Sequence, residues 1–125
     1  MARVTQRVDP VELDDLLERP RRAAIAFSSG GGIEPVPVAC LRHAGRLWIG
    51  AVREALPAAG TPGRAVLLID DGRYWFELRA VLLRVRLVAA PQSPPTASAE
   101  LAWFEAIPDR MVAWDYAALR EEADA

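Results

Sequence analysis

Apolar residues alternate with polar ones, or gather in short runs bounded by turn residues, along most of this chain. Such short runs are typical of β-strands rather than of helices. Six segments carry the pattern: residues 21–29, 34–43, 46–50, 64–70, 73–90 and 109–115. Because the turns between them are short, we predict a small, mostly antiparallel β-barrel of five or six strands with two peripheral helices.

Three places in these strands carry further expectations. The His-Ala-Gly turn at 43–45 and the Asp71-Gly72 pair both favour tight hairpins. The strand at 64–70 is almost wholly apolar, which predicts burial on both of its faces. In the longest strand the alternation is clear only from Val81 onward, which predicts a β-bulge near Arg79.

An N-terminal helix is predicted over about residues 10–19. Asp9 is a suitable N-cap, Pro10 fits the first helical position, and Glu12 completes a capping box. Pro20 then ends the helix.

A second helix is predicted over about residues 96–106, before the last strand. Leu101, Phe104 and Ile107 share a helical face, and Pro108 ends the element. Asp115 can cap a short final helical turn. No linker or repeat divides the chain, so residues 1–125 are predicted to form one domain, with the barrel over about residues 21–115.

Pro35 and Pro37 mark the second strand as an edge strand or a bulged one, because neither residue can donate a ladder hydrogen bond. Two interpretations stay open. Either the strand is simply an irregular edge, or its exposed backbone is a place where a flat ligand lies and exchanges hydrogen bonds with the chain.

Composition and charge limit the classes of function. The 125 residues are 52% apolar and 26% charged, as in ordinary globular domains, and the net charge is −2. All 15 basic residues are arginines interspersed with acidic residues, so no continuous basic stripe favours nucleic acid as a partner. No uncharged run is long enough for a membrane span and no leader-like apolar segment is present, so a cytoplasmic protein is expected.

The chain offers few groups for nucleophilic, acid–base or metal chemistry. Cys40 lies in an apolar run and is interpreted as a buried small hydrophobe. His43, the single histidine, is expected at a hairpin tip, without the partners that a metal site or a catalytic triad needs. We therefore predict no metal site and expect both residues to be dispensable for any activity.

Several segments, in their order and spacing, resemble the pyridoxamine 5'-phosphate oxidase-like proteins, the FMN-binding split barrels. The similar segments are "IAFSSGGGIEPVPVAC", "RLWIG" with Arg53 after it, "GRAVLLIDDGRYW", "ELRAVLLRVRLV" and "RMVAWDYAAL". Together they span about residues 21–119. The resemblance implies a six-stranded antiparallel split barrel with peripheral helices, forming a homodimer with two equivalent cofactor sites in the interface.

The resemblance also implies where a cofactor is held. In flavin-using relatives the ring system lies along the strand that here carries Val36, Pro37 and Val38. The phosphate is held at the position of Arg53, and the partner subunit's C-terminal strand, here the one with Trp114, closes over the site. The usual cofactor is FMN; some branches use the deazaflavin F420, and others bind haem or biliverdin.

The connector after Arg53 departs from the family's pattern. It reads "REALPAAGTPGR", without the further Lys or Arg that relatives commonly carry, and Glu54 adds a negative charge. Since a phosphate normally needs several donors, Arg79 or the backbone amides of "SSGGG" are candidates for the missing ones.

Two main functions are compatible with these observations. The favoured one is an FMN- or F420-dependent oxidoreductase acting on a small-molecule substrate, in which the cofactor carries the chemistry and no protein nucleophile is needed. The alternative is a non-catalytic split-barrel protein that binds a flavin, another planar ligand or no ligand. A purely structural dimer shares the same fold signals.

Overall fold

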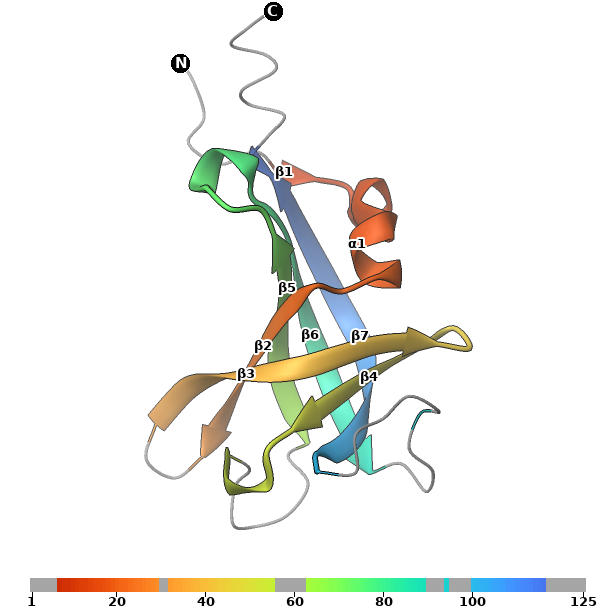
Figure 1. The fold of residues 1–125 in the computed structure, drawn as a ribbon, viewed down its shortest axis with the longest axis vertical. Helices are drawn as coiled ribbons and strands as arrows, with labels where there is room; N and C mark the ends of the chain where they lie inside the picture. The colour runs from red at the N-terminus through yellow and green to blue at the C-terminus, as the bar shows by residue number, and fades with distance from the viewer. Residues whose placement is uncertain (1–6, 30–31, 56–62, 90–93, 95–99, 117–125) are drawn as a thin grey trace, which may run out of the picture.

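The computed structural model describes residues 7–29, 32–55, 63–89, 94 and 100–116. Its strands are β1 (Arg7–Val8), β2 (Arg22–Ser29), β3 (Gly32–His43), β4 (Arg46–Ala51), β5 (Arg64–Asp71), β6 (Arg79–Ala89) and β7 (Ala102–Asp115). Its helices are α1 (Asp14–Glu18) and three 3₁₀ helices, η1 (Pro10–Leu13), η2 (Arg53–Ala55) and η3 (Trp75–Glu77). Strands β2 to β7 form a closed antiparallel barrel, which confirms the predicted six-stranded split barrel, and the short β1 is an addition to it (Figure 1).

The last strand closes the barrel. The strand order is β1-β7-β4-β3-β2-β5-β6, and β6 also pairs with β7. Strand β7 therefore lies between β4 and β6, and near its end it pairs with β1 as well. All of these pairings are antiparallel, as the short connections predict.

Side chains at alternate positions fill the interior of the barrel. In β5, Leu67 and Ile69 are fully buried, whereas Val66 and Leu68 are only partly buried. The prediction that both faces of this strand are buried is therefore wrong for the single chain. Only one face of an antiparallel sheet has to pack on the core, and the apolar outer face of β5 has no layer over it in the described part of the chain.

The N-terminal helix begins as predicted, with both halves of the capping box formed. The Val11 N–H donates to the Asp9 carboxylate at 3.1 Å, and the Asp9 N–H donates to the Glu12 carboxylate at 3.1 Å. The helix is divided into η1 and α1 and ends at Glu18 rather than at residue 19. Its buried leucines join the core of the barrel: Leu13, Leu16 and Leu17. None of the described helices has the length and apolar character needed to cross a membrane.

The second predicted helix, over about residues 96–106, is wrong where it overlaps the described residues. Residues 102–106 are the first part of β7, and residues 95–99 lie outside the described part. Phe104 and Ala106 point into the core and lie opposite Ile49 and Leu47 of β4. Apolar residues recur in this segment at the three-residue spacing of a helix and also at the two-residue spacing of a strand. The pairing with β4 selects the strand. Pro108 does not end the element, because it lies at a β-bulge, where a proline is tolerated.

The β5–β6 connection is longer than predicted. Asp71-Gly72 does not form a two-residue hairpin, since residues 72–78 form a loop that contains η3. Gly72 has a φ of +102° and the Glu77 N–H donates to the Tyr74 carbonyl at 2.9 Å, so the chain turns through a 3₁₀ helix before β6 begins. The strand accordingly starts at Arg79 rather than at residue 73. The predicted bulge near Arg79 is also wrong, because the register shift lies between Arg84 and Val85.

The hairpin between β3 and β4 is tight, as predicted. Ala44 and Gly45 form its turn with φ of 53° and 75°, which is the signature of a type I′ turn. His43 is exposed at the end of β3 beside this turn. The short helix expected after Asp115 falls largely on residues 117–125, outside the described part.

Candidate functional site

The middle of β3 has a free backbone edge. Residues 32–38 pair with β2, and residues 39–43 pair with β4, so the strand changes its partner between Val38 and Ala39. No described strand pairs with the other edge of β3 before Ala39. This places Val36, Pro37 and Val38, which are predicted to lie along a cofactor, in the stretch of β3 that has a described strand on one side only.

The two prolines determine what this edge can bind. The ladder with β2 runs without a break through Pro35 and Pro37, which lie opposite Ala26 and Ala24. A proline facing β2 would interrupt that ladder, so both prolines must face the free edge. Between residues 35 and 37 the edge therefore presents carbonyl oxygens without N–H groups. A ligand lying there can donate hydrogen bonds to the chain but cannot accept them from these two residues.

Arg53 lies where β4 separates from β3. Ala39 pairs with Gly50, so continuing the register brings Ala51, the last residue of β4, opposite Val38. The chain then leaves the sheet through η2, whose first residue is Arg53. The Arg53 side chain is exposed, and it has no ion pair or hydrogen bond within the described residues. The structure thus brings Arg53 next to the free edge of β3, with Glu54 exposed beside it.

Arg79 and Trp114 form a second group at the other end of the barrel. Arg79 lies opposite Asp115 and Ala80 lies opposite Trp114, so the two residues are neighbours across β6 and β7. Figure 1 shows the start of β6 and the end of β7 together near β1, whereas β4 ends at the opposite end of the barrel. Within one chain, the predicted site residues therefore divide into two groups that are far apart.

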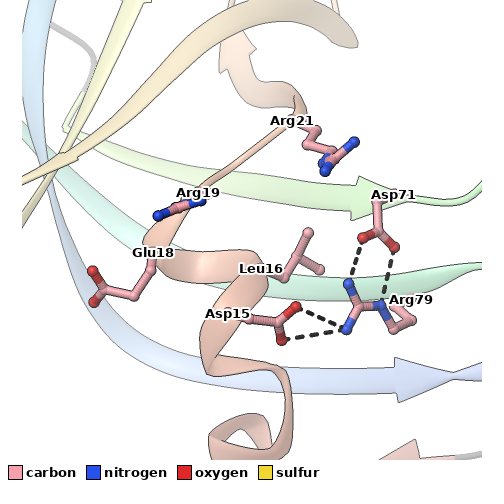
Figure 2. A pocket seen from close by; sticks show the side chains of 7 residues that line it. All are labelled: Asp15, Leu16, Glu18, Arg19, Arg21, Asp71 and Arg79. Carbon is pink, nitrogen blue, oxygen red and sulfur yellow. Dashed lines mark hydrogen bonds and ion pairs between the residues drawn. The ribbon is translucent and has the colours of Figure 1, made fainter.

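The guanidinium of Arg79 is bound to two carboxylates (Figure 2). Its Nε and Nη2 donate to Asp71 at 3.2 and 2.6 Å, and its Nη1 donates to Asp15 of α1 at 3.2 Å. These contacts, led by the hydrogen bond to Asp71, raise the pKa of Arg79, so the group stays cationic. For Arg79 to hold a phosphate, the ligand would have to displace the more exposed carboxylate, Asp15, whose side chain is 65% exposed.

A pocket of about 380 Å³ surrounds this ion-pair cluster (Figure 2). It lies between α1, the last residue of β5 and the first residue of β6. Arg19, Arg21 and Glu18 line it together with Leu16 and the three residues of the cluster. It carries as many acidic as basic side chains, so it has no net attraction for an anion. The sequence did not indicate this cluster, because Asp15 and Arg79 are 64 residues apart and meet only in the folded chain.

Cys40 is partly buried and its side chain packs against the core. Burial raises the pKa of the Cys40 thiol from 9.0 to about 12, although the charge of Arg42 lowers it in part. The thiol is therefore protonated near neutral pH, as expected of a small hydrophobe rather than a nucleophile. In the part of the chain that the structure describes, no three His, Cys, Asp or Glu side chains lie together as a metal site.

Comparison with known structures places this barrel among split-barrel proteins. It is similar to a protein named "Putative pyridoxamine 5'-phosphate oxidase" from Corynebacterium glutamicum, with 9% identity, a TM-score of 0.66, and coverage of 88% of this chain and 96% of that one. It is also similar to a FAD-binding protein of Mesorhizobium loti, with 12% identity, a TM-score of 0.65, and coverage of 90% and 96%.

A FAD-binding protein of Mycobacterium smegmatis is similar at 16% identity, with a TM-score of 0.60 and coverage of 86% of this chain and 95% of that one. No family model matches the sequence, and no curated protein matches it either. The likeness is thus one of fold, over nearly the whole length of both chains.

Proposed function

We propose that this protein is a flavin-binding split-barrel protein of the pyridoxamine 5'-phosphate oxidase-like kind, with FMN or F420 as its cofactor and a small molecule as its substrate. The observation that carries the proposal is the free edge of β3 beside Arg53. Split-barrel neighbours that are named as FAD-binding proteins support a flavin at such a site.

The chain's own groups would hold the ligand in two ways. The carbonyl oxygen of Pro35 or of Pro37 would accept a hydrogen bond from an N–H group at the rim of a planar ring system, such as the N3–H of a flavin. Arg53, which has no carboxylate partner within the described residues, can bind a phosphate with its guanidinium. The bound cofactor would supply hydride transfer, and these residues would position it.

We also propose that the protein acts as a homodimer in the cytoplasm. The ladders align five apolar residues across the outer face of the sheet: Pro37, Ala24, Leu68, Leu82 and Val112. None of the five is fully buried in the single chain. A second copy packed on this row would bury it, and Trp114 of the partner could then complete the site at Arg53. Light scattering at micromolar concentration should give twice the chain mass of 13.7 kDa.

One observation favours the non-catalytic alternative. Glu54 follows Arg53 directly, and the other predicted cation of the site, Arg79, is already bound to Asp71 and Asp15. A site with one free cation beside a carboxylate would hold a phosphate weakly. A protein that binds a flavin and shows its spectrum, but does not turn over when supplied with reductants and electron acceptors, would establish this alternative.

Titration with FMN and with riboflavin tests the site directly. Replacing Arg53 by Ala should weaken FMN binding by about 10- to 150-fold, because a charge-assisted hydrogen bond of about 1.5–3 kcal/mol is lost. Riboflavin has the same ring but no phosphate, so its affinity should change little. Arg73→Ala removes an exposed arginine of the β5–β6 loop and serves as the matched control. Equal weakening of both ligands, or a wild-type protein that binds neither, would contradict the proposal.

A further inference from the structure

Four arginines lie together on the outer face of the strands β5, β6 and β7. Arg64 of β5 lies directly opposite Arg86 of β6, and Arg84 of β6 lies directly opposite Arg110 of β7. Arg84 and Arg86 are two positions apart in one strand, so they point to the same face. We call these four residues the arginine patch. Figure 1 shows the three strands side by side along the barrel.

All four side chains of the patch are exposed, and none has an ion pair or hydrogen bond within the described residues. Among the carboxylates of these strands, Asp70 pairs with Arg22 and Glu105 pairs with Arg46, whereas Asp109, next to Arg110, has no ion pair within the described residues. Like charges directly opposite each other in a sheet destabilise it. The chain carries more acidic than basic residues, so the unpaired arginines do not reflect a shortage of carboxylates.

A β-bulge lies directly beside one of the two like-charge pairs. Arg84 lies opposite Arg110 in the same register that pairs Leu83 with Met111, and the next residue, Val85, lies opposite Pro108. Asp109 is thus the extra residue of the bulge and has no cross-strand partner. The carboxylate next to Arg110 in the sequence is therefore not placed opposite either arginine of this pair.

We propose that the arginine patch is a binding site for a compact ligand with two or more negative charges, of the phosphate or pyrophosphate class. Directly opposite residues have Cβ atoms about 5 Å apart, and alternate residues of a strand are about 7 Å apart. Four guanidinium groups can therefore converge on a small multiply charged group, with the bidentate geometry that phosphate favours. A bound anion would also relieve the repulsion between the paired arginines.

Urea unfolding with and without inorganic pyrophosphate tests this inference, at constant ionic strength set with NaCl. Pyrophosphate should raise the unfolding midpoint of the wild-type protein as its concentration rises. The double variant Arg84→Gln/Arg110→Gln should be more stable than wild type without pyrophosphate, because the repulsive pair is gone. The apparent Kd of this double variant for pyrophosphate should be at least tenfold higher than that of wild type. Arg73→Gln, which removes one positive charge outside the patch, should bind pyrophosphate as wild type does.

Three results would overturn the inference: no pyrophosphate response in the wild type, the same response in the double variant, or a double variant less stable than wild type without the anion. A response to a single-stranded oligonucleotide but not to pyrophosphate would overturn it as well, because the ligand would then be an extended polyanion. Neither the probe nor the readout involves a flavin, so this inference and the flavin proposal can fail separately.

Discussion

Gly50 is the position at which a single added methyl group should have the clearest effect on stability. It lies in β4 opposite Trp103 of β7, and an added Cβ would meet the six-membered ring of that indole. The distances would be 2.8 Å to Cζ2 and 2.9 Å to both Cε2 and Cη2. Carbon atoms in normal contact are about 3.5–4.0 Å apart, so the ring or the strand would have to move by roughly 0.6–1.2 Å.

The expected cost of Gly50→Ala is a difference of two terms. Overpacking of this kind costs about 1–3 kcal/mol. Replacing glycine by alanine in a compatible backbone recovers about 0.4–1 kcal/mol, because the unfolded chain loses conformational freedom. The net free energy of unfolding should therefore fall by roughly 0–2.6 kcal/mol, so steric strain should at least offset the entropic gain.

Urea unfolding followed by circular dichroism measures this change, with Gly63→Ala as the matched control. A Cβ at Gly63 meets no atom of the described residues within 4 Å, and this glycine does not have a positive φ. The control should therefore be neutral or slightly stabilising. Trp103→Phe removes the atoms that clash, so Gly50→Ala should cost much less in that background. If Gly50→Ala and Gly63→Ala have the same effect, or if Trp103→Phe gives no relief, the reasoning about this contact is wrong.

Three further outcomes follow from contacts elsewhere in the chain. Cys40 should react with a thiol reagent at pH 8 about a thousandfold more slowly than a free cysteine, because its pKa of about 12 leaves little thiolate. The unfolded thiol ionises at a lower pH than the folded one, so the contribution of Cys40 to stability should fall as the pH rises from about 9 to about 12. Asp9→Ala should lower the free energy of unfolding by about 1 kcal/mol, because the cap on the Val11 N–H is lost; an unchanged urea midpoint would contradict this. Arg79→Met should lower the free energy of unfolding by about 1–3 kcal/mol, because it leaves the Asp71 carboxylate, which is 17% exposed, without this partner. Adding Asp71→Asn to that variant should restore part of the lost stability, as measured by thermal unfolding.

Local signals predicted the fold well where the structure depends on neighbouring residues. The capping box at Asp9 and the turn at Ala44-Gly45 each need only a few adjacent residues, and both were predicted correctly. Phe104 shows the limit of such signals, since it fits a helical face with Leu101 and a strand face with Ala106. Its pairing with Ile49, far away in the sequence, selects the strand.

The candidate site was predictable only in part for the same reason. The sequence identified Pro35 and Pro37 as edge residues, and β3 does have a free edge there. The contact of Arg79 with Asp15 depends on where α1 docks on the barrel, which no local pattern reports. The pairing of Arg84 with Arg110 depends on the register between β6 and β7, which the alternation of apolar residues does not determine.

The position of β7 has a consequence for how the chain folds. This strand pairs with β4, with β6 and with Arg7 and Val8 of β1, so contacts across nearly the whole sequence form only when residues 102–115 are in place. Folds dominated by such distant contacts form slowly, because loop closure must precede the stabilising interactions. During synthesis β4 and β6 are made before β7, and each then exposes an edge that can pair with another chain. The protein should therefore be most prone to aggregation before its last strand has joined the barrel.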